Sequence, residues 1–166
     1  STQVADALKQ GWLALRSYDE VTCVPFADGG EGTLDCVESV SEISERIAIT
    51  VQGATGTEHL SSWLLVNGDT AVIEMAALCG ITTVEKLDSL GAHSYGLGQA
   101  IKQAIEDNRV KEILIAVGGS ASTDGGTGAL GALGYRFLDQ VIDGVVRTLY
   151  TRRRRQLHLT LFFGET

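Results

Sequence analysis

Two short segments combine glycines with carboxylates and hydroxyls, residue types that can bind phosphate and orient a reacting hydroxyl group. The longer segment, Gly118–Gly128, holds five glycines in eleven residues. Glycines let backbone N–H groups approach a ligand closely, and a helix that begins nearby presents its positive end to an anion. The segment therefore predicts a phosphate-binding loop in which Asp124 can hold Mg²⁺. The alternative is a tight connection that needs glycine only for positive φ angles.

The second segment, Asp28–Thr33, repeats this arrangement earlier in the chain. Its two carboxylates, Asp28 and Glu31, are three residues apart among three glycines. Such a loop suits a metal ion or a hydroxylated substrate, whereas the alternative is a solvated turn in which Glu31 or Thr33 only caps the next helix. Both segments follow predicted strands, so we expect them to face one crevice beyond the carboxyl ends of the sheet.

A further carboxylate, Glu74, is the one charge in the apolar segment Thr70–Ala77. Burial of an unpaired charge is costly. Glu74 is therefore expected either to form a structural ion pair or to face the cleft, and we favour the cleft.

The elements that must position these residues alternate between strands and helices. Hydrophobic spacing predicts helices over residues 3–16, 33–40, 97–107 and 129–134. Apolar and β-prone runs predict strands over residues 21–26, 43–51, 59–66, 70–75, 112–117 and 135–138. Asn67-Gly68 is typical of a hairpin turn between two of them. This alternation predicts an α/β fold built on a mostly parallel sheet.

The composition excludes several classes of protein. Hydrophobic residues make up 44% and charged residues 20% of the 166 residues, as in a globular protein. The net charge of −8 argues against nucleic acid as the main partner. No apolar run approaches the roughly 20 residues that cross a bilayer, and no signal peptide is recognised. The three cysteines lack metal-ligand spacing, which favours reduced thiols in a cytoplasmic protein.

Taken in order, five segments resemble the class I glycerate kinase family. They are Pro25–Thr33, Gly53–Thr57, Asp69–Ala76, Ser94–Gly98 and Gly118–Gly126. Each segment by itself is common in proteins, but five of them in this order and with suitable gaps are specific for the family. The similarity spans about residues 1–139.

The resemblance implies a two-domain α/β protein. Its first domain is a Rossmann- or flavodoxin-like three-layer structure, and the second is inserted into it. Residues 1–80 would form a partial first domain without its opening strand, and residues 81–139 a partial inserted domain that carries the glycine-rich loop. The family also has an early Asp-Ser-Phe-Lys-like segment with a functional lysine, which this chain lacks.

Residues 140–166 depart from the family pattern and form a basic tail with four consecutive arginines, Arg152–Arg155. We interpret this tail as the result of a frame change or truncation. The alternative is an edge strand with a basic linker.

The resemblance implies transfer of a phosphoryl group from ATP, with Mg²⁺, to D-glycerate, giving 2-phosphoglycerate or 3-phosphoglycerate. The candidate catalytic residues are Asp28, Glu31 and Asp124, with Asp28 and Asp124 as Mg²⁺ ligands and Glu74 as a further cleft residue. The candidates for binding substrate or nucleotide phosphates are Gly29, Gly30, Gly118, Gly119, Ser120, Ser122, Thr123, Gly125 and Gly126.

Two other functions are weighed against this one. The chain can be an inactive fragment of a glycerate kinase that at most binds ligand, or, less favoured, a dinucleotide- or sugar-phosphate-binding domain. Neither nucleic acid nor membrane is expected as a partner, and a homodimer is left open.

Overall fold

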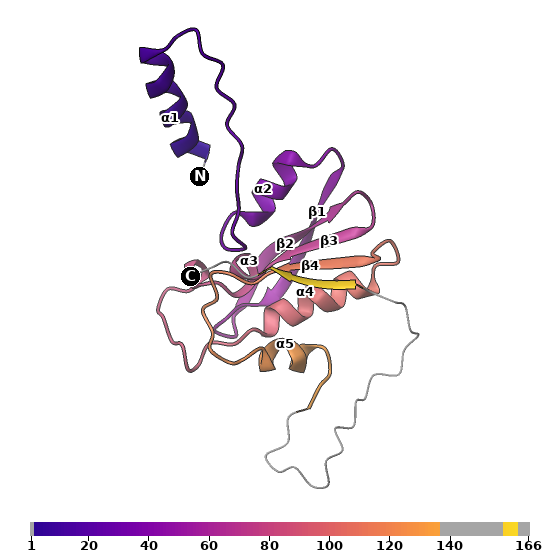
Figure 1. The fold of residues 1–166 in the computed structure, drawn as a ribbon. Helices are drawn as coiled ribbons and strands as arrows, with labels where there is room; N and C mark the ends of the chain where they lie inside the picture. Colours follow the sequence, from indigo (N-terminus) through magenta and orange to yellow (C-terminus); the bar gives the residue numbers. More distant parts are fainter. Residues whose placement is uncertain (1, 137–157, 163–166) are drawn as a thin grey trace.

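Five strands form one sheet in the order in which they occur in the chain (Figure 1). The strands are β1 (Ser44–Gln52), β2 (Glu58–Val66), β3 (Thr70–Glu74), β4 (Glu112–Ala116) and β5 (His158–Phe162). β1 with β2 and β2 with β3 are antiparallel pairs, whereas β3 with β4 and β4 with β5 are parallel pairs. The structure is a computed structural model that describes residues 2–136 and 158–162.

The predicted α/β class is confirmed, but the sheet is mixed and not mostly parallel. The reason is the length of two connections. A tight turn between Gly53 and Thr57 joins β1 to β2, and Asn67-Gly68 joins β2 to β3 with positive φ angles of 52° and 78°. Such short turns can join only antiparallel neighbours. The longer connection from β3 to β4 contains a helix, as a parallel pair requires.

Helices cover both faces of the sheet, so the three predicted layers are present. On one face lies α2 (Thr33–Val40), and on the other lie α3 (Met75–Cys79) and α4 (Tyr95–Glu106). The short helix α5 (Thr127–Ala132) packs on α4, and a 3₁₀ turn, η1 (Ile81–Thr83), follows α3.

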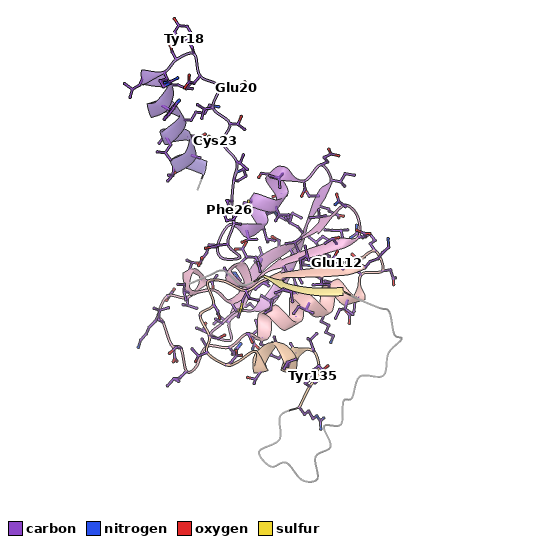
Figure 2. The ribbon with its side chains drawn as sticks, in the orientation of Figure 1. Tyr18, Glu20, Cys23, Phe26, Glu112 and Tyr135 are labelled. Atoms are coloured by element: carbon purple, nitrogen blue, oxygen red, sulfur yellow. The ribbon has the colours of Figure 1, made fainter. Side chains whose placement is uncertain are left out.

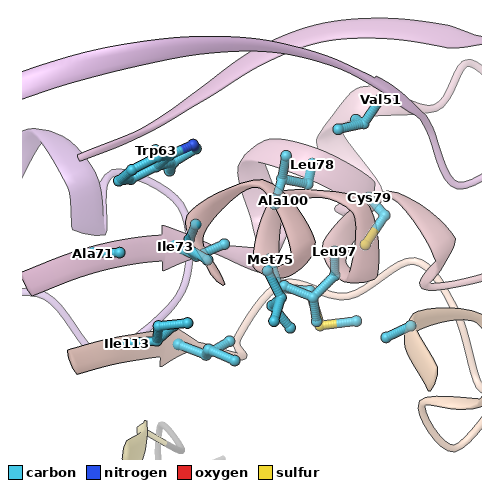
Figure 3. Close-up of a cluster of buried hydrophobic side chains, with 14 of the residues drawn as sticks. Val51, Trp63, Ala71, Ile73, Met75, Leu78, Cys79, Leu97, Ala100 and Ile113 are labelled. Carbon is cyan, nitrogen blue, oxygen red and sulfur yellow. The ribbon is translucent and has the colours of Figure 1, made fainter. Parts of the chain in front are cut away.

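Side chains of the strands alternate between these two layers, as the period of two in a strand requires. Trp63 and Ile73 belong to the larger buried cluster, which α3 and α4 cover (Figure 3). Leu64 and Val72 belong to a smaller cluster that Leu34 of α2 covers. The predicted helix over residues 33–40 and the three predicted strands from residue 43 to residue 75 are confirmed within one or two residues at each end.

The helix predicted over residues 3–16 is confirmed as α1 (Thr2–Leu15), which projects away from the sheet (Figure 1). Its apolar side chains are exposed; Leu8 is 70% and Leu15 89% exposed. Figure 2 shows Tyr18 and Phe26 in the segment that connects α1 to α2.

Two predicted strands are wrong where the structure describes them. Residues 21–26 form no strand, because β-prone residues form a strand only when their backbone groups pair with a neighbouring strand. The free edge of β4 is taken by β5 instead. Tyr135 and Arg136 are also outside any strand: Gly134, with φ 95°, ends the helical region, and the Tyr135 N–H donates to the Leu130 carbonyl at 3.0 Å. Residues 137 and 138 lie outside the described residues.

The segments 1–80 and 81–139 share one sheet in the described part of the chain, since β3 pairs with β4 across the predicted domain boundary. In the predicted tail, residues 158–162 pair with β4 as an edge strand, which agrees with the alternative interpretation of that region. The four arginines lie outside the described residues. No described helix has the length and hydropathy needed to cross a membrane.

Candidate functional site

The carboxyl ends of β1, β3 and β4 lie at the same edge of the sheet. β1 and β3 are both antiparallel to β2, so they run in one direction, and β4 is parallel to β3. The turn at Gly53–Thr57, helix α3 and the Gly118–Gly128 loop therefore all begin at this edge, where ligands bind in open α/β sheets.

The two acidic, glycine-rich segments contact each other at this edge. The Gly118 N–H donates to the Gly29 carbonyl oxygen at 2.8 Å. A Cβ atom at Gly118 would lie 2.7 Å from the Gly30 nitrogen, so only glycine fits there. The Glu31 carboxylate lies over the second loop, because its Oε1 would be 2.8 Å from a Cβ atom at Gly119. The expected convergence of the two segments is confirmed, although the first of them follows no strand.

Backbone pairing fixes the second loop to the end of α3. The Ile81 N–H donates to the Gly119 carbonyl at 2.9 Å, and the Ala121 N–H donates to the Cys79 carbonyl at 3.1 Å. These bonds form a bridge between Gly80 and Ser120. The start of the loop is therefore held firmly in place.

Hydroxyl groups of the loop form hydrogen bonds within the protein. Ser120 Oγ accepts the Ser122 N–H at 3.1 Å, and Thr123 Oγ1 donates to the Ser89 carbonyl at 2.8 Å. Gly125 and Gly126 follow with positive φ angles of 62° and 81°. The positive φ angles agree with the alternative interpretation, a tight connection that requires glycine, whereas binding of phosphate by the loop stays a prediction.

Asp124 is surrounded by donors of the protein itself. Its Oδ2 accepts the Ser94 N–H and hydroxyl at 2.8 Å each and the Gly128 N–H at 3.0 Å. Its Oδ1 accepts the Gly126 N–H at 3.0 Å and the Ser122 hydroxyl at 3.3 Å. Partial burial raises the pKa of Asp124, but the hydrogen bonds from Ser94, Gly128 and Gly126 outweigh it and leave the pKa below its ordinary value. The Asp124 carboxylate therefore holds the loop in shape by accepting hydrogen bonds from the loop itself and from Ser94.

Ser94, which is not among the predicted site residues, is central to this arrangement. It is 1% exposed, and its Oγ also accepts the Ala129 N–H at 3.0 Å. Ser94 and Asp124 together join the first turns of α4 and α5. The signal in the sequence is the hydroxyl-bearing segment Ser94–Gly98 at the start of the predicted helix, although Ser94 Oγ makes no capping hydrogen bond to α4 itself.

His93 links the turn at Gly53–Thr57 to the same region. The backbone N–H of His93 donates to the Ala54 carbonyl at 2.9 Å, and the ring Nδ1 of His93 accepts the backbone N–H of Tyr95 at 3.3 Å. All five segments of the family resemblance therefore meet at one edge of the sheet.

The sequence predicted that Glu74 either forms an ion pair or faces the cleft, and the structure shows neither. It is 4% exposed and lies beneath the start of α2, where Oε1 accepts the Gly32 N–H at 3.2 Å and Oε2 accepts the Leu34 N–H at 2.8 Å. Burial raises the pKa of Glu74 above its ordinary value, and the two backbone hydrogen bonds only partly offset this effect.

Asp28 and Glu31 are the predicted catalytic carboxylates that remain exposed. Asp28 Oδ1 accepts the Gly30 N–H at 3.0 Å. Asp28 and Gly29 also line one end of a groove of about 810 Å³ whose floor includes Val72 and Leu114. Of the three predicted catalytic carboxylates, only Asp28 and Glu31 can therefore reach a ligand without breaking the structure of the loops.

The two predicted Mg²⁺ ligands differ in how well they fit a metal ion. Among the described residues, no group of three or more His, Cys, Asp or Glu side chains forms a metal site. Mg²⁺ in phosphoryl-transfer sites usually needs only one or two carboxylates beside the phosphates. Asp124 does not fit this role, because its oxygens already accept five hydrogen bonds. Asp28, exposed at the groove, fits as a single ligand.

Comparison with known proteins identifies the family of the chain. The chain matches the glycerate kinase family over residues 1–151. It is 39% identical to the glycerate 2-kinase of Escherichia coli (strain K12), in an alignment that covers 84% of this chain and 37% of that protein. It is 36% identical to a glycerate kinase of Neisseria meningitidis, covering 83% of this chain and 37% of the relative.

A solved structure, described as a glycerate kinase 2 from Salmonella typhimurium LT2, superimposes with a TM-score of 0.64. It is 34% identical, and the match covers 81% of this chain and 37% of that structure. The chain thus spans little more than a third of the length of these relatives. Because the family match extends over most of the chain, the protein belongs to the glycerate kinase family.

Proposed function

We propose that this chain contributes the phosphate- and acceptor-binding edge of an ATP-dependent D-glycerate kinase whose product is 2-phosphoglycerate. The observation that carries the proposal is the direct contact between the two glycine-rich segments at Gly118 and Gly29. Phosphoryl transfer asks a protein mainly to position donor and acceptor beside each other. Two loops in contact at one edge of a sheet meet that requirement.

The charges of the two segments suggest how the roles divide between them. In the second loop, the oxygens of the Asp124 carboxylate are occupied by internal donors, and backbone N–H groups of Thr123 and Gly125 are the groups that would bind the phosphates of ATP. In the first loop, the exposed carboxylates of Asp28 and Glu31 would repel phosphate and suit a hydroxyl of the acceptor. Asp28 is our candidate for accepting the proton of that hydroxyl.

Mg²⁺, when bound, would neutralise part of the charge on the phosphates. Asp28 is the residue of this chain that fits as its ligand. Asp124 is proposed here only as the residue that shapes the loop.

The first experiment is turnover by the purified chain with ATP, Mg²⁺ and D-glycerate. Phosphorus NMR distinguishes 2-phosphoglycerate from 3-phosphoglycerate directly. Asp28→Asn is expected to lower turnover by about 10²–10⁴-fold, as loss of a general base does. Asp6→Asn, on the projecting helix α1, is the matched control and should be as active as the unsubstituted chain. Normal turnover by Asp28→Asn would remove Asp28 from the reaction.

A second candidate is ligand binding without turnover, which is favoured by the limited coverage of the relatives' length. Titration with ATP and with D-glycerate, followed by amide chemical shifts of Gly29–Gly32 and Gly118–Gly126, tests it. Shifts in both segments without product formation would support this candidate over the first.

A further inference from the structure

Glu74 holds the start of α2 from a strand forty residues further along the chain. It is the last residue of β3, and its two carboxylate oxygens accept the N–H groups of Gly32 and Leu34. These N–H groups belong to the N-terminus of α2, where a helix leaves donors without partners of its own. Glu74 therefore acts as the cap of a helix with which it is not contiguous.

The helix cannot supply this cap from its own N-cap position. That position is Gly32, with φ 86°, and it makes no side-chain hydrogen bond to the helix. A residue with a side chain would be strained at this φ angle, and capping side chains usually act from an extended N-cap backbone, so the usual Ser, Thr, Asp or Asn cap is disfavoured there. The turn that exposes Glu31 thus requires glycine, and the acceptor must come from elsewhere in the fold.

The cap is connected to the contact between the two loops. Thr33 N–H and Oγ1 both donate to the Gly30 carbonyl, at 3.3 and 2.7 Å, which closes the turn above Glu74. The Gly29 carbonyl in turn accepts the Gly118 N–H at 2.8 Å. Hydrogen bonds at neighbouring residues of the first segment therefore connect Glu74 at one end to the loop after β4 at the other.

We propose that Glu74 is a positioning residue, which keeps the Gly29–Gly30 backbone and the Glu31 carboxylate against Gly118 and Gly119 by holding the N-terminus of α2. The expected effect of Glu74 on ligand binding rests on the proposed function. Its effect on the position of the first segment rests on the backbone contacts alone. Burial of a carboxylate is costly, but the usual cap at the N-cap position is not open to α2, because that position is Gly32. The fold instead uses the end of β3, which also begins the edge where the segments meet.

The test compares Glu74→Gln with Asp35→Asn by amide hydrogen exchange measured with NMR. Gln keeps the size of the side chain but replaces one acceptor oxygen by a donor. Asp35 is also in the first turn of α2, but its carboxylate is exposed and pairs with Arg46. In Glu74→Gln, exchange at Gly32, Leu34 and Gly118 should accelerate by at least about tenfold, because a hydrogen bond to a charged group is lost. In Asp35→Asn, exchange at these amides should not change.

The second readout is ligand affinity. Glu74→Gln should raise the dissociation constants for ATP and D-glycerate by at least about tenfold, and Glu74→Asp, which keeps the charge, should restore part of the affinity. Faster exchange at Gly32 and Leu34 with unchanged exchange at Gly118 and unchanged affinity would overturn the proposal, since the cap would then be local. If Glu74→Gln does not fold, the same amides are measured in Glu74→Asp, where unchanged exchange at all three overturns it.

Failure of the proposed function gives a different result. If the unsubstituted chain binds neither ATP nor D-glycerate, the exchange at Gly118 still decides whether Glu74 positions the first segment. Acceleration there supports the structural role, and its absence contradicts it.

Discussion

At the scale of residues, the carboxylates of the site fall into two kinds. Asp124 and Glu74 accept N–H groups of the protein, at the N-termini of α4 and α5 and of α2 respectively. Asp28 and Glu31 are exposed at the same edge. The positive ends of these helices already face carboxylates of the protein itself, so we propose that phosphate binds to the backbone of the loop and not to a helix N-terminus. Substitution should reduce stability for the first kind and activity for the second.

Asp124→Asn is expected to lower the free energy of unfolding by about 1–3 kcal/mol, because the amide can accept fewer of the five hydrogen bonds and carries no charge. Urea denaturation followed by circular dichroism measures the change. Asp28→Asn is the control and should alter stability by less than about 0.5 kcal/mol. Equal stability of the Asp124 variant and the unsubstituted chain would show that these bonds are not formed in solution.

The raised pKa of Glu74 predicts a pH dependence of stability with a definite sign. Burial raises the pKa above its ordinary value of 4.5, and the nearby carboxylates of Asp35 and Glu31 act in the same direction. Between pH 4.5 and the raised pKa, the folded chain binds more protons than the unfolded chain, so the free energy of unfolding falls as pH rises. Glu74→Gln removes this titration.

The difference in unfolding free energy between the unsubstituted chain and Glu74→Gln should therefore be constant below pH 4.5. Above that pH it should decrease and then level off. Urea denaturation over a series of pH values measures it. An increase of the difference with pH in this window would mean that the hydrogen bonds from Leu34 and Gly32 outweigh the burial.

At the scale of elements, the site depends on close approach of backbone between helices and loops. α4 and α5 approach each other at Gly98, where a Cβ atom would lie 2.2 Å from the Ala129 carbonyl oxygen. This contact holds α5 beside the start of α4, where Asp124 accepts N–H groups from both helices. The small residue at position 98 is thus part of what shapes the second loop.

Gly98→Ala should lower the free energy of unfolding by about 1–3 kcal/mol, since backbone must shift to admit the methyl group. Gly131→Ala, in α5, is the matched control because no atom lies within 4 Å of its Cβ position. The control should be neutral or stabilising by up to about 1 kcal/mol, as alanine favours helix. Thermal unfolding of both variants gives the comparison, and equal stability of the two would contradict the close packing of α4 on α5.

At the scale of the whole molecule, α1 and the sheet are separate in Figure 1, and the groove over β3 and β4 is open. The apolar side chains of α1, such as Leu8 and Trp12, are 70% and 53% exposed. The Trp12 indole donates to Asp19 in the segment that follows the helix. Helix α1 is therefore stabilised by contacts within residues 2–23, to which the Cys23 thiol adds a weak bond to the Ala5 carbonyl.

Removal of residues 1–15 should leave the stability of the sheet and its helices nearly unchanged. We expect a change of less than about 0.5 kcal/mol in the free energy of unfolding, as for surface positions without buried contacts. Thermal unfolding monitored at the buried Trp63 measures it. A clear loss of stability would show that α1 packs on the rest of the chain in solution.

The sequence by itself determined the local elements and the family. Helix α2 and the hairpin of β2 and β3 follow from hydrophobic period and from Asn67-Gly68, signals that lie within a few residues of each other. The strand over residues 21–26 was wrong because a strand needs a partner, which no local pattern supplies. The two acidic, glycine-rich segments predicted a common crevice beyond the carboxyl ends of the strands, and the structure brings them into contact there.

Only the tertiary structure decided what each carboxylate does. Asp28 and Asp124 have similar surroundings in the sequence, namely glycines in a loop, whereas Glu74 lies within an apolar predicted strand, and none of these surroundings gives the role of the carboxylate. Their environments depend on partners far along the chain: Ser94 is 30 residues from Asp124, and Leu34 is 40 residues from Glu74. The charge and reactivity of a carboxyl group depend on burial and on the donors that reach it. Both are set by how distant segments pack, and no local pattern of residues contains them.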